Sequence, residues 1–155
     1  MLAVDQASKL WLIGLLADRP GIELTAFFNL VLVWNRGVSF GMFGAADLGP
    51  WPFVVLSLAI VAGLAVWLWR LDRLWLALAV GAVIGGALGN VVDRIAYGAV
   101  ADFFDFHLRG YHWPAFNVAD SAIVVGVAAL VLEALTRRRP DAPEGARKTE
   151  NGTRS

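Results

Sequence analysis

Three aspartates near one end of an apolar segment are the side chains in this sequence best placed to do chemistry. Asp120 lies in the run Phe116–Ser121, at the mouth of an apolar stretch that continues to Leu135. Asp102 and Asp105 lie three residues apart in the shorter polar segment before it. A carboxylate is costly to bury in a membrane and usually has a function there. Two acids at one membrane face indicate acid/base chemistry, and the spacing alone leaves open whether Asp102 or Asp105 is the partner of Asp120.

Asp120 also has a simpler interpretation, as part of a polar cluster that satisfies free N–H groups where a helix begins. Asp is favoured at that place, and Asn117 lies three residues earlier, on the same side of a helix. However, Asp120 lies about six positions past Pro114, on the order of 9 Å along a helix axis. If the helix begins near Pro114, that is too far for capping, and we expect a functional role for Asp120.

Two further groups of polar residues fall at helical spacings. Asn90, Asp93 and Arg94 share one side of a helix end. They would form either a salt-bridged polar cluster at the membrane surface or a group that organises the outer loops around the acids. Asp5 and Lys9 lie four residues apart, the spacing of an intrahelical ion pair that lets two charges lie in a bundle. For both groups the structural and the functional interpretations stay open.

The composition is that of an integral membrane protein. Hydrophobic residues make up 58% and charged residues 17% of the 155 residues, and the mean hydropathy is +0.62, more apolar than a soluble domain needs. Trp51–Trp69 and Leu74–Val92 contain no charged residue and are long enough to cross a membrane as helices, and a third span follows Pro114. Leu2–Leu16 is shorter and contains charges, so we interpret it as the second half of a helix that starts upstream of Met1.

The basic residues indicate the orientation in the membrane. Arg70 and Arg73 lie in the tight turn between two spans, and a second basic group follows the last span. By the positive-inside rule both regions are cytoplasmic, so residues 17–50 and 93–113 lie on the outer side. We therefore predict an all-α polytopic fold of four transmembrane helices with both termini in the cytoplasm. The net charge of zero gives no indication of nucleic-acid binding, and the absence of cysteine excludes disulfides and thiol catalysis.

The outer segment between the first two spans predicts a small β-hairpin. Phe28–Trp34 is rich in branched and aromatic residues, as expected of a strand, residues 35–37 form a turn, and Val38–Phe43 would be a return strand or an apolar loop. One four-helix domain covers residues 1–136, and the charged residues 137–155 form a disordered cytoplasmic tail. The third span also carries small residues on which a neighbouring helix can pack closely. These are Gly81, Gly85, Gly86 and Gly89.

The sequence shows no metal-binding or serine-hydrolase motif. His107 and His112 do not fit a His-Glu-x-x-His pattern, and there is no Gly-x-Ser-x-Gly elbow. We expect neither a metal nor another cofactor. One alternative function is a non-catalytic membrane scaffold, and another is a small transporter or proton-conducting subunit, because paired intramembrane acids also mark ion paths. Against the transporter, the acids lie at one face of the membrane and no inverted repeat is visible.

Five blocks, taken in order, resemble the motifs of bacterial lipoprotein signal peptidase, also called signal peptidase II. They are Asp5–Lys9, Asn35–Gly41, Gly85–Arg94, Val100–Phe103 and Phe116–Ser121. The resemblance covers roughly residues 4 to 135. It implies a four-helix aspartic peptidase of the bacterial inner membrane, active at the outer face. Such an enzyme removes the signal peptide of prolipoproteins on the N-terminal side of the diacylglyceryl-modified cysteine. We expect a monomer whose partners are these prolipoproteins and membrane lipid, with no nucleic acid.

The resemblance also implies roles for individual residues. The catalytic pair falls on Asp102, in the Val-x-Asp-Phe block, and on Asp120, in the Asn-x-x-Asp block, and Asp105 is left as a bystander. Supporting or substrate-contacting positions are Asp5, Lys9, Asn35, Gly37, Asn90, Asp93, Arg94 and Asn117. If the pair lies close together, like-charge repulsion keeps one acid protonated near neutral pH. The ionised carboxylate then activates a water molecule while the protonated one donates to the scissile carbonyl.

Overall fold

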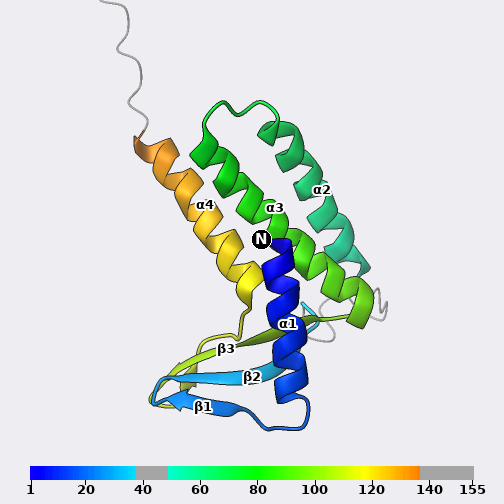
Figure 1. The fold of residues 1–155 in the computed structure, drawn as a ribbon, viewed down its shortest axis with the longest axis vertical. Coiled ribbons are helices and arrows are strands. Elements are labelled where there is room, and N and C mark those ends of the chain that lie inside the picture. The colour runs from blue at the N-terminus through cyan, green and yellow to red at the C-terminus, as the bar shows by residue number, and fades with distance from the viewer. Residues whose placement is uncertain (38–48, 137–155) are drawn as a thin grey trace, which may run out of the picture.

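The computed structural model describes residues 1–37 and 49–136 and consists of a helical bundle with a small sheet at one end (Figure 1). In chain order the elements are α1 (Leu2–Leu16), β1 (Ile22–Thr25), β2 (Phe28–Asn35), α2 (Trp51–Leu68), α3 (Leu74–Tyr97), β3 (Val100–Leu108), β4 (Tyr111–His112) and α4 (Val118–Thr136). The predicted tail, and the predicted return strand or loop Val38–Phe43, lie outside the described residues.

Three of these helices, α2, α3 and α4, are long and apolar enough to cross a membrane. They confirm the three long apolar helices predicted from the sequence, although α3 continues past the predicted end at Val92 to Tyr97. Gly98 then ends α3, because its φ of 73° and its N–H bond to the carbonyl of Arg94 (3.1 Å) form a left-handed cap. The first helix, α1, has 15 residues and is shorter than a span. The four predicted helices are present, and three of them have spanning length.

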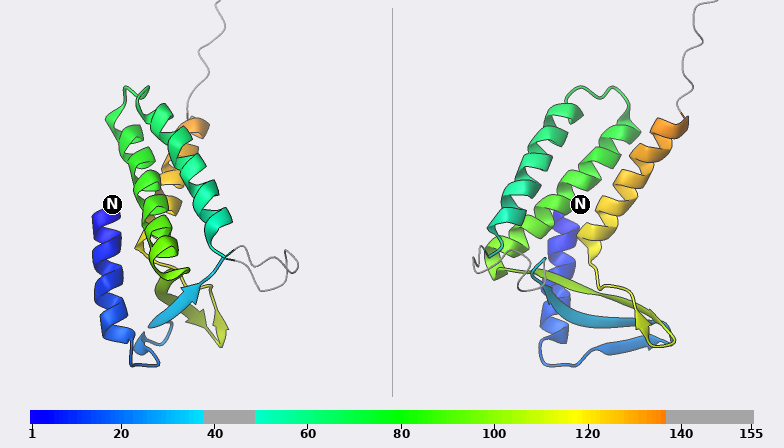
Figure 2. Two further views of the ribbon diagram at one scale, coloured as in Figure 1. Left: turned by 90° about the vertical axis from the view of Figure 1, so that its right-hand side faces the viewer. Right: turned by 180° about the vertical axis from the view of Figure 1, so that it is seen from behind.

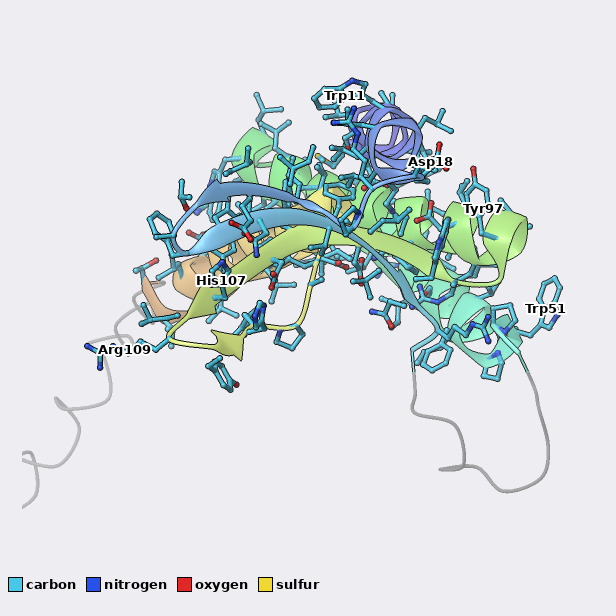
Figure 3. All side chains as sticks on the ribbon, turned by 90° about the horizontal axis from the view of Figure 1, so that it is seen from below. Trp11, Asp18, Trp51, Tyr97, His107 and Arg109 are labelled. Carbon is cyan, nitrogen blue, oxygen red and sulfur yellow. The ribbon has the colours of Figure 1, made fainter. Side chains whose placement is uncertain are left out.

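The short helix α1 runs beside α3 and reaches the sheet (Figure 2). Its Leu12 and Leu16 are buried together with Phe103 of β3, and this apolar cluster attaches the helix to the sheet. Leu10 and Trp11 are exposed, and Trp11 lies on the outer side of α1 when the molecule is seen from below (Figure 3). The helix therefore presents one face to the protein, and that face also carries the buried charges described below.

The sheet has four antiparallel strands in the order β1-β2-β3-β4. It lies at the end of the bundle away from the turn between α2 and α3 (Figure 1). The strand β2 confirms the predicted strand, and its partners within the described residues are β1 and β3, so the sheet has more strands than a hairpin. The longest strand is β3, whose Asp102 and Asp105 made the segment read as a polar loop, although its valine and phenylalanines favour a strand.

An irregularity in β3 decides where its aspartates point. The N–H groups of Phe103 and Phe104 both donate to the carbonyl of Phe116, at 3.1 and 2.8 Å, so two residues of β3 oppose one residue of the neighbouring segment. This is the arrangement of a β-bulge, and both phenylalanines pack with the apolar cluster of α1. A regular strand would place residues three apart on opposite faces. The bulge instead brings Asp102 and Asp105 to the same face.

The predicted glycine face of α3 is confirmed at the end near the sheet. A Cβ at Gly86 would lie 2.5 Å from the carbonyl oxygen of Ala119 in α4, and one at Gly89 would overlap the carboxylate of Asp5 in α1. Gly85 likewise faces the start of α1. A Cβ at Gly81 would meet open space, so this glycine does not take part in the packing. Close approach of α1 and α4 to α3 brings their polar residues to the helix end that carries the candidate site.

Candidate active site

Asp120 lies in the first turn of α4, as part of a reciprocal helix cap. Its N–H donates to Oδ1 of Asn117 (3.0 Å), and the N–H of Asn117 donates to Oδ2 of Asp120 (3.2 Å). This is the geometry of a capping box, in which two free donors are satisfied at once. The expectation that Asp120 lies too deep for capping is wrong, because α4 begins at Val118 and not near Pro114. The cap therefore occupies Oδ2 of Asp120 and leaves Oδ1 to bind other groups of the site.

Asp102 approaches the same place from β3, where its side chain is buried. Asn35 Nδ2 donates to its Oδ2 (2.9 Å), and Asn117 Nδ2 donates to its Oδ1 (2.7 Å). Asn90 Nδ2 donates to Oδ1 of Asp120 (2.8 Å). Asn117 therefore binds both acids, Asp102 through its side chain and Asp120 through its backbone.

The environment of Asp102 favours its protonated form. Burial raises its pKa to about 6, against the hydrogen bond from Asn35, which lowers it. The charge of Asp120 adds to the rise, while Asn117 and Lys9 oppose it. A carboxyl group with this pKa keeps a proton in mildly acidic solution, as a proton donor in catalysis must.

Lys9 is a buried cation with three partners. Its Nζ lies 2.9 Å from Asp5, 2.9 Å from Asp93 and 3.0 Å from Oδ1 of Asn90. The side chains of Lys9, Asp5 and Asp93 are 2%, 0% and 1% exposed, so solvent screens none of these contacts. The predicted pair of Asp5 and Lys9 is confirmed. In the described structure Asp93 forms its ion pair with Lys9 of α1 and not with the adjacent Arg94, so the expected salt bridge within α3 is replaced by one between helices.

The two carboxylates of this network also hold the backbone next to the acids. Asp5 Oδ1 accepts a hydrogen bond from the N–H of Ala119 (2.9 Å), and Asp93 Oδ2 accepts one from the N–H of Ala101 (3.1 Å). Each of these alanines immediately precedes one of the two acids in the chain. The buried charges therefore tie the strand that carries one acid and the helix that carries the other to α1 and α3.

Gln6 belongs to the same network and was missed by the sequence analysis. Its Nε2 donates to Asp93 Oδ1 (3.0 Å) and to the carbonyl of Gly89 (3.2 Å), and it lies 3.2 Å from Asp5 Oδ2. The available signal was its place inside the block Asp5–Lys9, next to a buried acid. Its contacts are long-range, and spacing along one helix does not reveal them.

Arg94 and Gly37 border the site on the side of α2. Arg94 interacts electrostatically with both acids, and its Nη1 donates to the carbonyl of Asn90 (3.3 Å). The N–H of Gly37 donates to Oδ1 of Asn35 (2.9 Å), and its φ of 95° is a conformation that favours glycine. With these two residues, every predicted supporting residue has been located in or beside the network around the acids.

Asp105 shares the face of Asp102 but has separate partners. Its two carboxylate oxygens lie 2.9 and 3.0 Å from Nδ1 of His112, and Asn29 Nδ2 donates to Oδ2 (3.2 Å). Burial would raise the pKa of Asp105, but the hydrogen bonds with His112 and Asn29 hold it below its usual range. Although Asp105 lies in a segment that is polar in sequence, it is a buried strand residue. Its environment favours the ionised form.

The arrangement can perform acid/base chemistry on a water molecule. Asp102 and Asp120 share Asn117, and the N-terminus of α4 favours negative charge close to Asp120. A protonated acid beside an ionised one can donate and accept a proton in the same step. Among residues 1–37 and 49–136, no group of three or more His, Asp or Glu side chains is placed to hold a metal ion.

Comparison with known proteins points in one direction. Residues 1–136 match the family described as signal peptidase II. A lipoprotein signal peptidase of Methylorubrum extorquens is 51% identical over 146 residues, which cover 92% of this chain and 84% of that protein. One from Beijerinckia indica is 47% identical over 146 residues, covering 92% of this chain and 87% of that protein.

Two solved structures share the fold. A bacterial membrane enzyme determined by the in meso method at 1.9 Å resolution matches with a TM-score of 0.72 at 28% identity, covering 88% of this chain and 88% of that chain. A second, determined by the same method at 2.3 Å resolution, matches with a TM-score of 0.69 at 27% identity, covering 91% of this chain and 89% of that chain. The similarity thus includes both the spans and the sheet.

Proposed function

The chain belongs to the signal peptidase II family, whose members remove signal peptides from prolipoproteins, and we propose that it does so as an aspartic endopeptidase. The proposed catalytic dyad is Asp102 and Asp120. The observation that carries this proposal is the position of Asn117, which binds one acid through its side chain and the other through its backbone. Asp102 of β3 and Asp120 of α4 are thereby held at one site, as acid/base catalysis by two carboxyl groups requires.

In the proposed mechanism Asp120 is the base and Asp102 is the acid. Asp120 takes a proton from a water molecule as the water oxygen attacks the scissile carbonyl carbon, and Asp102 gives its proton to the carbonyl oxygen. The product is a gem-diol. When it collapses, the C–N bond breaks, the proton on Asp120 passes to the leaving amine, and a gem-diol hydroxyl returns a proton to Asp102. Water and peptide are consumed, and both acids end as they began.

The supporting residues act by positioning in this proposal. Asn35 orients Asp102 from β2, and Asn90 orients Asp120 from α3. Lys9 in turn donates to the amide oxygen of Asn90, which leaves the nitrogen of Asn90 free to donate to Asp120. The hydrogen-bonding direction of Asn90 is therefore set by a buried charge.

The distribution of basic residues supports an orientation in the bacterial inner membrane. Arg70 and Arg73 lie in the turn between α2 and α3, at the opposite end of the bundle from the sheet (Figure 1). By the positive-inside rule that end is cytoplasmic, and the dyad lies at the outer face. We propose that α1 is the fourth membrane helix, with Asp5 and Lys9 facing the protein. The substrate is a prolipoprotein held beside the spans of a monomeric enzyme, with its diacylglyceryl-modified cysteine at the membrane surface.

The proposal is tested by the products of cleavage. The purified chain in detergent should cut a diacylglyceryl-modified prolipoprotein at the bond before the modified cysteine, as shown by the masses of both products. Asp120→Asn keeps a hydrogen-bond acceptor for the helix cap but cannot take the proton, so it should leave the substrate uncut. Cleavage by Asp120→Asn at the parental rate would contradict the dyad.

A further inference from the structure

Phe53, at the start of α2, lies between two residues that border the dyad. A Cβ placed on Gly37 would lie 2.8 Å from two ring carbons of Phe53, so the ring occupies the space that a side chain at Gly37 would need. The guanidinium carbon of Arg94 lies 5.3 Å from the centre of the same ring, over its face. Aromatic rings attract a cation in this position. The ring of Phe53 therefore lies against both the end of β2 and Arg94 of α3.

Each of these two residues, Gly37 and Arg94, is linked to one of the acids by two hydrogen bonds. On the strand side, the N–H of Gly37 donates to Oδ1 of Asn35 (2.9 Å), and Asn35 Nδ2 donates to Asp102 (2.9 Å). The first bond fixes which way the Asn35 amide faces, because its oxygen is occupied by Gly37. Only its nitrogen can then point at Asp102.

On the helix side, Arg94 donates to the carbonyl of Asn90 (3.3 Å), and Asn90 Nδ2 donates to Asp120 (2.8 Å). Arg94 also interacts electrostatically with both acids. Its guanidinium is planar, and stacking on the ring of Phe53 restricts where it can lie. Phe53 therefore lies against residues that are linked to both acids.

We propose that Phe53 is a positioning residue for the peptidase reaction, whose ring holds Gly37 and Arg94 in place and thereby fixes the hydrogen bond from Asn35 to Asp102. The inference rests on the proposed function of the dyad. No sequence motif identifies Phe53, because its partners Gly37 and Arg94 come from the end of β2 and from α3. A planar ring is required, since it must lie close to a residue without a side chain and also present its face to a flat cation.

The test compares Phe53→Leu with Phe53→Tyr in the purified full chain, using cleavage of a diacylglyceryl-modified prolipoprotein over a range of pH. Asn35 lowers the pKa of Asp102, and Asp120 of α4, Lys9 of α1 and Arg94 of α3 carry charges that act on Asp102. Loss of the ring loosens Asn35. The pH at which activity falls should therefore rise by roughly half a unit, the size expected when one hydrogen bond to the carboxylate is weakened but not lost.

We expect kcat of Phe53→Leu to fall about tenfold, with KM changed less, because the acids and not the substrate are displaced. Phe53→Tyr keeps the ring and should restore both kcat and the parental pH profile. Combining Phe53→Leu with Asn35→Ala should give the pH profile of Asn35→Ala alone. Trp51→Leu is the matched control, since Trp51 lies in the same turn of α2 and is exposed (Figure 3). It should leave kcat and the profile unchanged.

Phe53→Met is a second variant, which fills similar space without an aromatic face and replaces Phe53→Leu if that variant does not fold. A parental pH profile and kcat in either folded variant would overturn the inference, and so would a fall in kcat without a shift of the profile. If the parent does not cleave, or if Asp102→Asn still cleaves, the proposed function fails and takes the inference with it. An active parent with an inert Asp102→Asn separates the two outcomes.

Discussion

Replacing Lys9 by methionine should strongly destabilise the protein, because it strands two buried carboxylates. Lys9 Nζ lies 2.9 Å from both Asp5 and Asp93, and all three side chains are at most 2% exposed. With an effective dielectric constant of about 20, each contact corresponds to roughly 6 kcal/mol of Coulomb attraction. Most of this attraction offsets the cost of removing the three charges from water, and removal of one partner from a buried pair costs about 3–5 kcal/mol.

The free energy of unfolding would be measured in mild detergent by titration with a denaturing detergent, followed by circular dichroism. Arg73→Met is the matched control, because it removes a cation that lies 2.6 Å from Glu133 but is 58% exposed. Exposed pairs contribute about 1 kcal/mol or less. The two substitutions remove the same charge, so the difference between them measures the effect of burial.

A double-mutant cycle identifies the source of the loss. In the background of Asp93→Asn one of the stranded carboxylates is absent, so Lys9→Met should cost less there, by roughly 0.5–3 kcal/mol. Equal costs for Lys9→Met and Arg73→Met would refute the reasoning. So would a Lys9→Met cost that is the same with and without the Asp93 carboxylate.

Two further predictions concern the pH profile and the helix packing. The kcat/KM of the parent should fall as the pH rises through about 6, where Asp102 loses its proton. Asn35→Ala should move this fall to higher pH, because Asn35 lowers the pKa of Asp102. The pH–rate profiles of the two proteins check this, and a shift to lower pH in Asn35→Ala would contradict it. Gly86→Ala should lower the thermal unfolding midpoint, because its Cβ would lie 2.5 Å from the carbonyl oxygen of Ala119. In the control Gly81→Ala, on the same helix, the Cβ meets open space, so the midpoint should stay the same or rise slightly. Equal effects of the two alanines would rule out the close approach of α3 and α4 at Gly86.

The helices were predictable because a charge-free apolar run of spanning length has few alternatives. The pair of Asp5 and Lys9 was also predictable, because its spacing of four is local to one helix. Asp93, the second acid bound to Lys9, was not assigned to it, since α1 and α3 are far apart in the sequence. Phe53 escaped notice for the same reason.

Two errors near the acids have local physical causes. The start of α4 was placed near Pro114, because proline favours the first turn of a helix, but Phe116 instead pairs with β3 and the helix begins at Val118. The strand β3 was read as a polar segment because of Asp102 and Asp105, whose spacing of three does not fit the alternation of a regular strand. Neither the pairing of Phe116 nor the bulge is visible without the neighbouring segments.

The central claim is that Asp102 and Asp120 form the catalytic dyad and that Asp105 does not belong to it. The most direct test is single-turnover cleavage of a diacylglyceryl-modified prolipoprotein at a pH below 6, by Asp102→Asn, Asp120→Asn and Asp105→Asn, each shown to be folded by circular dichroism. The account predicts that the first two variants leave the substrate intact and that Asp105→Asn cleaves at a rate close to the parent. Cleavage by folded Asp102→Asn or Asp120→Asn, or loss of cleavage in folded Asp105→Asn alone, would contradict it.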